Sequence, residues 1–157
     1  MKLTLVLVAA SLIFPVSGPA RPSSTTGVAA CALLRLPRAA PSGEITYFGH
    51  IAALKRKGTR FELRFDPALW LTGITASRAS LADTGSGDVP NDYFIRDLDH
   101  RLLTFVVPRT TRVTVLTRGT CTTRSSVAAL ARSPTRAGFW IRVRNDTVRT
   151  LDQQYQP

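Results

Sequence analysis

The chain has 157 residues, of which 44% are hydrophobic and 20% are charged, so it can bury a core and is not a disordered polymer. This length suits one domain. Its 21 Lys and Arg residues outnumber 10 Asp and Glu, which gives a formal net charge of +11. Such a surplus attracts polyanions, although a basic surface can also simply be solvated.

The first twenty residues have the order of regions found in a secretory signal peptide. Lys2 precedes an apolar run over residues 3–14, and small residues follow it. We therefore expect a signal peptide over residues 1–20, cleaved after Gly18 or Ala20. The run is too short to cross a membrane as a helix, so the mature protein is expected to be secreted and not integral to a membrane.

Residues 21–42 are rich in Ser, Thr, Pro, Ala and Arg and are predicted to be a flexible linker. In an oxidising compartment, Cys31 of this segment can form a disulfide with Cys121. Residues 28–31 are also similar to the site at which bacterial lipoproteins are cut and lipidated. Cys31 can therefore carry a lipid anchor at the cell envelope instead, and both uses remain open.

Residues 43–157 are predicted to form a single β-rich domain that begins with a hairpin. Residues 44–54 and 59–66 alternate between apolar and polar side chains, as half-buried strands do. The polar residues 55–58 end with glycine, which is typical of a turn. Residues 66–67 (Asp-Pro) are expected to end the second strand and begin a helical turn.

A helix is predicted over residues 74–82, with Ile74, Leu81 and the small residues Ala76 and Ala79 on its buried side. Alternation, capping and turn signals predict the remaining elements. They are strands at 92–96, 101–107 and 112–117, a short helix at 125–132 capped by Ser125, and a hairpin of 139–144 and 147–151. Asn145 and Asp146 at its tip suit a turn with positive φ.

These elements indicate a mainly β fold with two short helices. A small antiparallel barrel or a curved sheet would hide the edge strands, and an OB-like or SH3-like barrel is the specific expectation. Trp70 and Leu71 are interpreted as a plug for the mouth of this barrel, since Trp buries a large area.

Four stretches of the domain resemble motifs of a group of exported, mostly actinobacterial proteins with no assigned function. They are residues 65–73 (FDPALWLTG), 91–96 (NDYFIR), 101–107 (RLLTFVV) and 153–157 (QQYQP). The usual forms are FDPAxWLTGxxA, NDYYIRN, RLRTLPV and EQYxP, from which Phe94, Asp97 and Gln153 depart. The resemblance implies export and a shared small domain over about residues 44–157, and it implies no reaction, ligand or partner.

Residues of these stretches provide a candidate ligand face, made of Trp70, Tyr93, Arg96 and Tyr155. Trp70 would offer a flat platform if it does not plug the barrel. Arg96 is expected to form an ion pair or a hydrogen bond with Asp97 or Asp99 beside it. Tyr155 is expected to pack the chain end onto the sheet.

No catalytic, cofactor or metal site is predicted. Half of the acidic residues fall in one segment, as Asp83, Asp88, Asp92, Asp97 and Asp99. Their spacing is not that of a calcium-binding EF-hand loop, and the His and Cys residues include no closely spaced zinc ligands. A small hydrolase with His50 or His100 as its base is a disfavoured alternative, because no nucleophile motif accompanies them.

The function predicted is that of a non-enzymatic binding or interaction domain at the cell envelope or outside the cell. The alternative is a basic module that binds anionic polymers or membrane surfaces. Basic and aromatic residues of the hairpins could serve it, namely Tyr47, Phe48, Arg60, Arg64, Phe139, Trp140, Arg142 and Arg144. Export argues against nucleic acid as the natural partner.

Overall fold

The computed structural model describes residues 32–33, 39–97, 99–117, 119–133 and 135–156. All of them belong to one compact unit, Cys31–Pro157. The predicted signal peptide, its cleavage site and Cys31 lie outside the described residues. Within those residues, no helix combines the length and the apolar character needed to cross a membrane.

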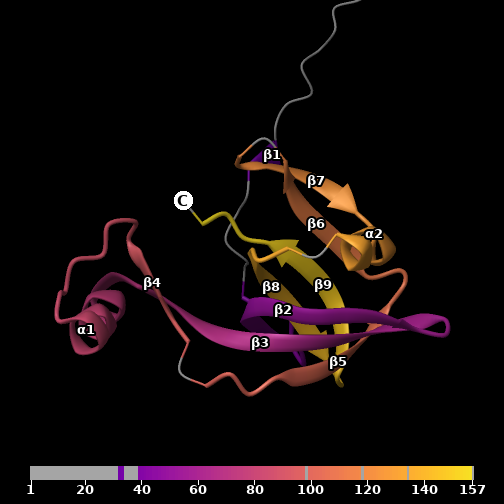
Figure 1. Cartoon of the computed structure of the whole chain (residues 1–157), viewed down its shortest axis with the longest axis horizontal. Coiled ribbons are helices and arrows are strands. Elements are labelled where there is room, and N and C mark those ends of the chain that lie inside the picture. Colours follow the sequence, from indigo (N-terminus) through magenta and orange to yellow (C-terminus); the bar gives the residue numbers. More distant parts are fainter. Residues whose placement is uncertain (1–31, 34–38, 98, 118, 134, 157) are drawn as a thin grey trace, which may run out of the picture. The chain divides into compact units, whose positions relative to one another are not determined.

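The described residues form a mainly β fold with two short helices, which confirms the predicted fold class (Figure 1). The elements in chain order are β1 (Ala32–Leu33), β2 (Ile45–Lys57), β3 (Arg60–Thr72), α1 (Gly73–Thr84), β4 (Tyr93–Arg96), β5 (Leu103–Pro108), β6 (Arg112–Thr117), β7 (Cys121–Ser125), α2 (Val127–Arg132), β8 (Gly138–Arg144) and β9 (Thr147–Gln153).

Five strands pair in a ring and so form a small barrel. β2 pairs with β3 and β8, β3 pairs with β5, and β9 pairs with both β5 and β8, so the order β2-β3-β5-β9-β8 returns to its start. Only the β5–β9 contact in this ring is parallel. A five-stranded Greek-key barrel is the architecture of the OB fold. β6 and β7 continue the sheet from β9, and β1 pairs with β7.

The hydrophobic core fills this ring, because alternate side chains of each strand point inward. On β3 the inward residues are Phe61, Leu63 and Phe65, which are almost completely buried. Residues of other elements complete the same cluster, among them Phe105, Val107, Val127, Leu130, Phe139, Ile141 and Leu151. The intervening residues of β3 therefore form part of the outer surface.

The predicted end of the second strand at residues 66–67 is wrong, because β3 continues to Thr72. β3 pairs with β5 as far as Phe65 and with β4 from Leu69 onward. Pro67 is paired with Gly49 of β2, and the described pairings give it no partner in β4 or β5. A strand tolerates proline at such a position, since the missing N–H costs no ladder hydrogen bond there.

The predicted helix is present as α1, but its predicted buried side is only partly right. Ala76 and Ala79 are buried as predicted, together with Ser80, whereas Ile74 and Leu81 are 73% and 56% exposed. α1 packs against β3 and β4 and lies away from the barrel (Figure 1), so no core covers its large side chains. We call α1 and β4, with residues 69–72 of β3, the extension.

Three smaller features complete the comparison with the predicted elements. Ser126, not Ser125, caps α2, because its Oγ accepts a hydrogen bond of 3.1 Å from the Ala129 amide. Strands β1 and β7 were not predicted, and β1 lies within the segment expected to be a linker. The final hairpin is confirmed, with Asn145 and Asp146 at φ values of 48° and 55°.

Candidate functional site

The outer surface of the β2–β3 hairpin carries four exposed cations, Lys55, Lys57, Arg60 and Arg64, which we call the cation face. Lys57 lies directly opposite Arg60 in the antiparallel register, and Lys55 lies opposite Glu62. Like charges placed directly opposite each other destabilise a pair of strands. Glu62 offsets part of this repulsion through its ion pair with Lys57.

A hollow of about 340 Å³ adjoins the cation face. Its lining includes Lys57, Arg60 and Glu62 of the hairpin, Thr104 and Phe105 of β5, and Asp146 of the β8–β9 turn. The Val106 amide donates a hydrogen bond of 2.9 Å to the Asp146 carbonyl, which holds that turn beside β5. In OB folds, oligonucleotides and oligosaccharides bind over the second and third barrel strands and the flanking loops. The second and third strands of the ring in this protein are β3 and β5, which border the hollow.

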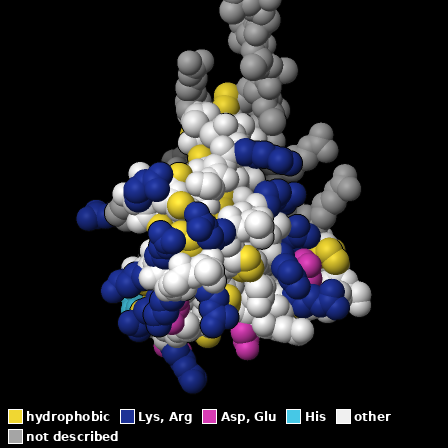
Figure 2. Space-filling model, turned by 90° about the vertical axis from the view of Figure 1, so that its right-hand side faces the viewer, with side chains coloured by type: hydrophobic (Ala, Val, Ile, Leu, Met, Phe, Trp, Pro, Cys, Tyr) yellow, Lys and Arg dark blue, Asp and Glu magenta, His cyan; other side chains and the backbone are white. Residues whose placement is uncertain are grey.

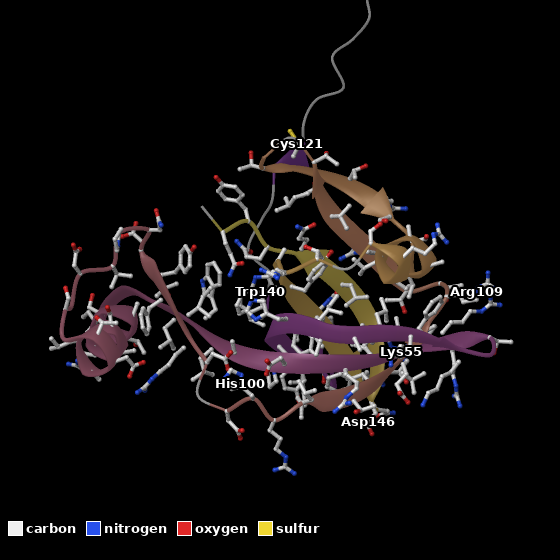
Figure 3. All side chains as sticks on the ribbon, viewed as in Figure 1. Lys55, His100, Arg109, Cys121, Trp140 and Asp146 are labelled. Carbon is white, nitrogen blue, oxygen red and sulfur yellow. The ribbon has the colours of Figure 1, made fainter. Side chains whose placement is uncertain are left out.

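Positive charge is concentrated at the end of the unit that carries the tip of the hairpin. Figure 2 faces this end and shows many Lys and Arg side chains and few Asp or Glu side chains. In Figure 3, Lys55, Arg109 and Asp146 all lie toward this end. Such a surface raises the local concentration of anionic ligands and speeds their association.

The predicted ligand face is only partly assembled, around Trp70. The ring of Trp70 stacks on Tyr93, with centroids 4.0 Å apart and planes 15° apart, and it also contacts Phe48 and Trp140. We call these four residues the aromatic cluster. Neither Trp70 nor Leu71 belongs to the core cluster that fills the barrel or packs against it, so the interpretation of these two residues as a plug of the barrel is wrong.

Arg96 and Tyr155 do not belong to the aromatic cluster. Arg96 donates two hydrogen bonds, of 2.8 and 2.7 Å, to the carboxylate of Asp83, and so joins β4 to α1. Arg96 therefore forms an ion pair, but the predicted partners Asp97 and Asp99 are wrong, because the partner is Asp83. Tyr155 is 38% exposed and borders a separate hollow of about 310 Å³ with Gln153 and Leu116.

The residues predicted to bind polyanions are dispersed by the fold. Phe139 belongs to the core, Tyr47 packs on Phe105 with ring centroids 5.8 Å apart, and Arg142 approaches Glu44 to 3.6 Å. Arg60 and Arg64 remain on the cation face. Sequence reasoning missed Lys55 and Lys57 because it assigned them to a turn, whereas strand β2 extends through Lys57.

The cysteine and histidine residues considered as candidate site residues lie in different parts of the fold. Cys121 lies in β7 opposite Leu33 of β1. Since Cys31 lies outside the described residues, the predicted disulfide and the predicted lipid anchor both stay predictions. His50 lies opposite Asp66 in the β2–β3 register, and His100 lies in the connection between β4 and β5.

Comparisons with known proteins add no family to this geometry. No family model matches the chain, and neither a curated protein nor a solved structure matches it. The resemblance to exported actinobacterial proteins therefore stays a prediction. The case for a function rests on the cation face and its hollow.

Proposed function

We propose that this protein is an exported, non-enzymatic binding domain whose cation face and adjoining hollow bind an anionic polymer outside the cell or at its envelope. The observation that carries the proposal is the register of the hairpin. It sets Lys57 opposite Arg60 and adds Lys55 and Arg64 to the same surface, with Glu62 between them.

An anionic ligand would reduce the electrostatic repulsion between the cations of the cation face. Exposed Lys and Arg side chains can spread into solvent, so the repulsion is modest in the free protein. A bound polyanion would place negative groups between the cations and release its own counterions. The free energy of binding would then depend strongly on salt concentration.

The hollow favours an anionic polysaccharide over a single-stranded nucleic acid. Phe61 and Phe105 are only 4% and 6% exposed, so neither ring can stack on a base, as single-strand binders require. Thr104, Glu62 and Asp146 instead offer hydrogen-bonding groups of the kind that bind sugar hydroxyls. Negative groups of the polymer would contact the cation face while its hydroxyls occupy the hollow.

The test measures binding of fluorescein-labelled dextran sulfate by fluorescence anisotropy, with uncharged dextran in parallel. The quadruple variant Lys55→Gln, Lys57→Gln, Arg60→Gln, Arg64→Gln should bind at least tenfold more weakly than the native protein. Its plot of log affinity against log salt concentration should also be shallower, because fewer counterions are released.

The matched control removes four cations elsewhere, as Arg78→Gln, Arg101→Gln, Arg124→Gln and Arg136→Gln. Equal losses in the two variants would show that net charge alone attracts the polymer, and the proposed site would be wrong. Binding to phosphatidylglycerol vesicles without binding to dextran sulfate would replace the polymer with a membrane surface. Far-UV circular dichroism verifies that both variants are folded.

A further inference from the structure

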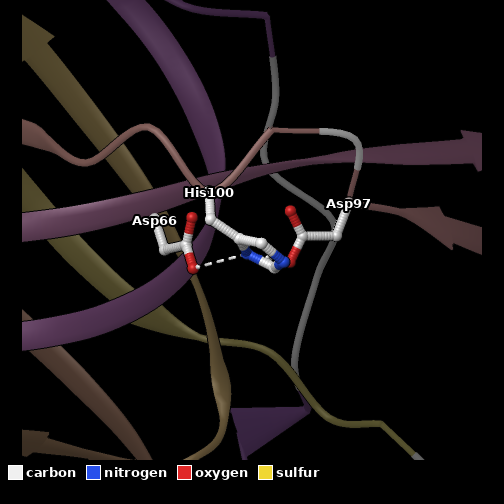
Figure 4. Close-up of side chains that lie close together, drawn as sticks. All are labelled: Asp66, Asp97 and His100. Atoms are coloured by element: carbon white, nitrogen blue, oxygen red, sulfur yellow. Dashed lines mark ion pairs between the residues drawn. The ribbon is translucent and has the colours of Figure 1, made fainter.

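Asp66, Asp97 and His100 meet where β3 changes partners. β3 leaves β5 after Phe65 and joins β4 at Leu69. The connection from β4 to β5 passes this point and brings Asp97 and His100 to the carboxylate of Asp66 (Figure 4). The three side chains therefore come from a strand and from a connection that is distant from it in sequence.

The two separations of His100 from the carboxylates fit ligands around a common ion better than direct hydrogen bonds. The His100 Nδ1 atom lies 3.5 Å from Asp66 Oδ2 and 3.5 Å from Asp97 Oδ2. A charge-assisted N–H···O bond is shorter, at about 2.7–2.9 Å. In a tetrahedral zinc centre with bonds of about 2.1 Å, neighbouring ligand atoms lie about 3.4 Å apart. All three ligand atoms here lie within 4.8 Å of one another.

The carboxylate of Asp66 also lacks part of its expected bonding. Its Oδ1 atom is buried and has no hydrogen-bond partner, and its side chain is only 21% exposed. Among the ion pairs of the described residues, Asp66 and Asp97 each pair with His100 and with no Lys or Arg. Two adjacent carboxylates with a single histidine between them are an arrangement that a divalent cation stabilises.

We propose that Asp66, Asp97 and His100 bind a divalent transition-metal ion of the zinc type. One imidazole and two carboxylates suit such borderline ions, whereas Ca²⁺ and Mg²⁺ prefer oxygen ligands alone. His100 is 79% exposed, so solvent can complete the coordination. The ion would tie the connection between β4 and β5 to β3. The proposal uses none of the residues of the cation face.

Isothermal titration of the tag-free, chelator-treated full chain with zinc chloride tests the proposal. We expect one Zn²⁺ per chain, no heat of binding with calcium chloride, and a rise of the melting temperature with Zn²⁺ alone, since a ligand that binds only the folded state stabilises it. Asp97→Asn and His100→Ala should each weaken Zn²⁺ binding at least tenfold. Both positions are exposed, and circular dichroism confirms that the variants fold.

Asp99→Asn is the matched control. It removes the same charge as Asp97→Asn from the same connection, but the Asp99 carboxylate accepts a hydrogen bond from the Arg101 amide instead. This variant should bind Zn²⁺ like the native protein. Native-like Zn²⁺ binding by His100→Ala or by Asp97→Asn, or no saturable binding to the native chain at millimolar Zn²⁺, would overturn the proposal. The dextran sulfate titration is independent of these outcomes.

Discussion

The barrel and the extension share strand β3 but are stabilised in different ways. The barrel encloses large side chains that are fully buried, such as Phe65, Phe139 and Ile141. The helix of the extension buries Ala76, Ala79 and Ser80, and leaves its large apolar residues exposed. The extension is instead held together by strand pairing, the stack of Trp70 on Tyr93, and an ion pair.

This contrast shows how one strand can serve two structures of unequal stability. Burial of apolar area is the dominant favourable term in folding, and most of it lies in the barrel. The extension depends on contacts that are individually worth about 1 kcal/mol or less. Substitutions in the barrel should therefore affect global unfolding, while those in the extension should change local opening.

The largest effect is expected in the barrel core. Phe65→Ala should lower the free energy of unfolding by about 3–5 kcal/mol, because it removes a fully buried ring and leaves a cavity. Urea denaturation followed by circular dichroism measures the loss. The control Ile74→Ala in the extension should change stability by less than about 0.5 kcal/mol. Similar losses for both variants would contradict the distinction between the two regions.

The second prediction concerns the close approach of β2 and β3 at Gly49. A Cβ atom at this position would lie 2.0 Å from the carbonyl oxygen of Asp66, so the two backbones must separate to accept alanine. Gly49→Ala should cost about 3 kcal/mol in urea denaturation. At Gly87, a Cβ atom would lie 3.7 Å from its nearest neighbour, and Gly87→Ala should not destabilise the protein. A tolerated Gly49→Ala would show that the strands are farther apart.

The third prediction concerns the stack of Trp70 on Tyr93, which lies within the extension. In a double-mutant cycle of Trp70→Leu and Tyr93→Leu, we expect a coupling free energy of about 0.5–1.5 kcal/mol, as found for aromatic pairs. Hydrogen exchange of the β4 amides should become faster in each single variant. A coupling of zero would mean that the two rings do not stack in solution.

The smallest effect is expected for the ion pair between Arg96 and Asp83. Both side chains are about one-third exposed, at 32% and 30%, so solvent screens their attraction. A double-mutant cycle of Arg96→Gln and Asp83→Asn should give about 0.5 kcal/mol, falling as salt is added. A coupling above that of the aromatic stack would reverse the order proposed for the contacts of the extension.

Sequence patterns correctly predicted the elements that depend mainly on residues close together in the chain. The alternation of Phe61, Leu63 and Phe65 identified a strand and its buried face, and Asn145 and Asp146 identified the last turn. Pro67 misled the prediction, because its tolerance depends on which strands pair on either side of it. Ile74 and Leu81 misled it in the same way, since a helix buries the side that meets a neighbour and α1 has no core beneath it.

The candidate sites depend on long-range pairing to a still greater degree. The cation face requires that β2 extend through Lys57, in register with Arg60. The sequence could not predict this extent, because turns and strand ends rich in Lys have the same composition. Asp66 and His100 are far apart in the chain. They meet only because β3 changes its pairing partner from β5 to β4 near Asp66. Spacing rules for metal ligands assume neighbours on one turn or loop, so no motif could have grouped these residues.

Because β3 is long, it separates a positively charged region from an acidic one and so gives the domain a dipole moment. With 13 residues, this strand spans at most about 40 Å, which is several screening lengths at physiological salt. The hairpin tip at one end is strongly positive, whereas residues 73–100 at the other end contain five Asp against two Arg. A negatively charged surface would therefore orient the protein before contact, turning the tip toward itself and leaving the acidic pole directed at the medium.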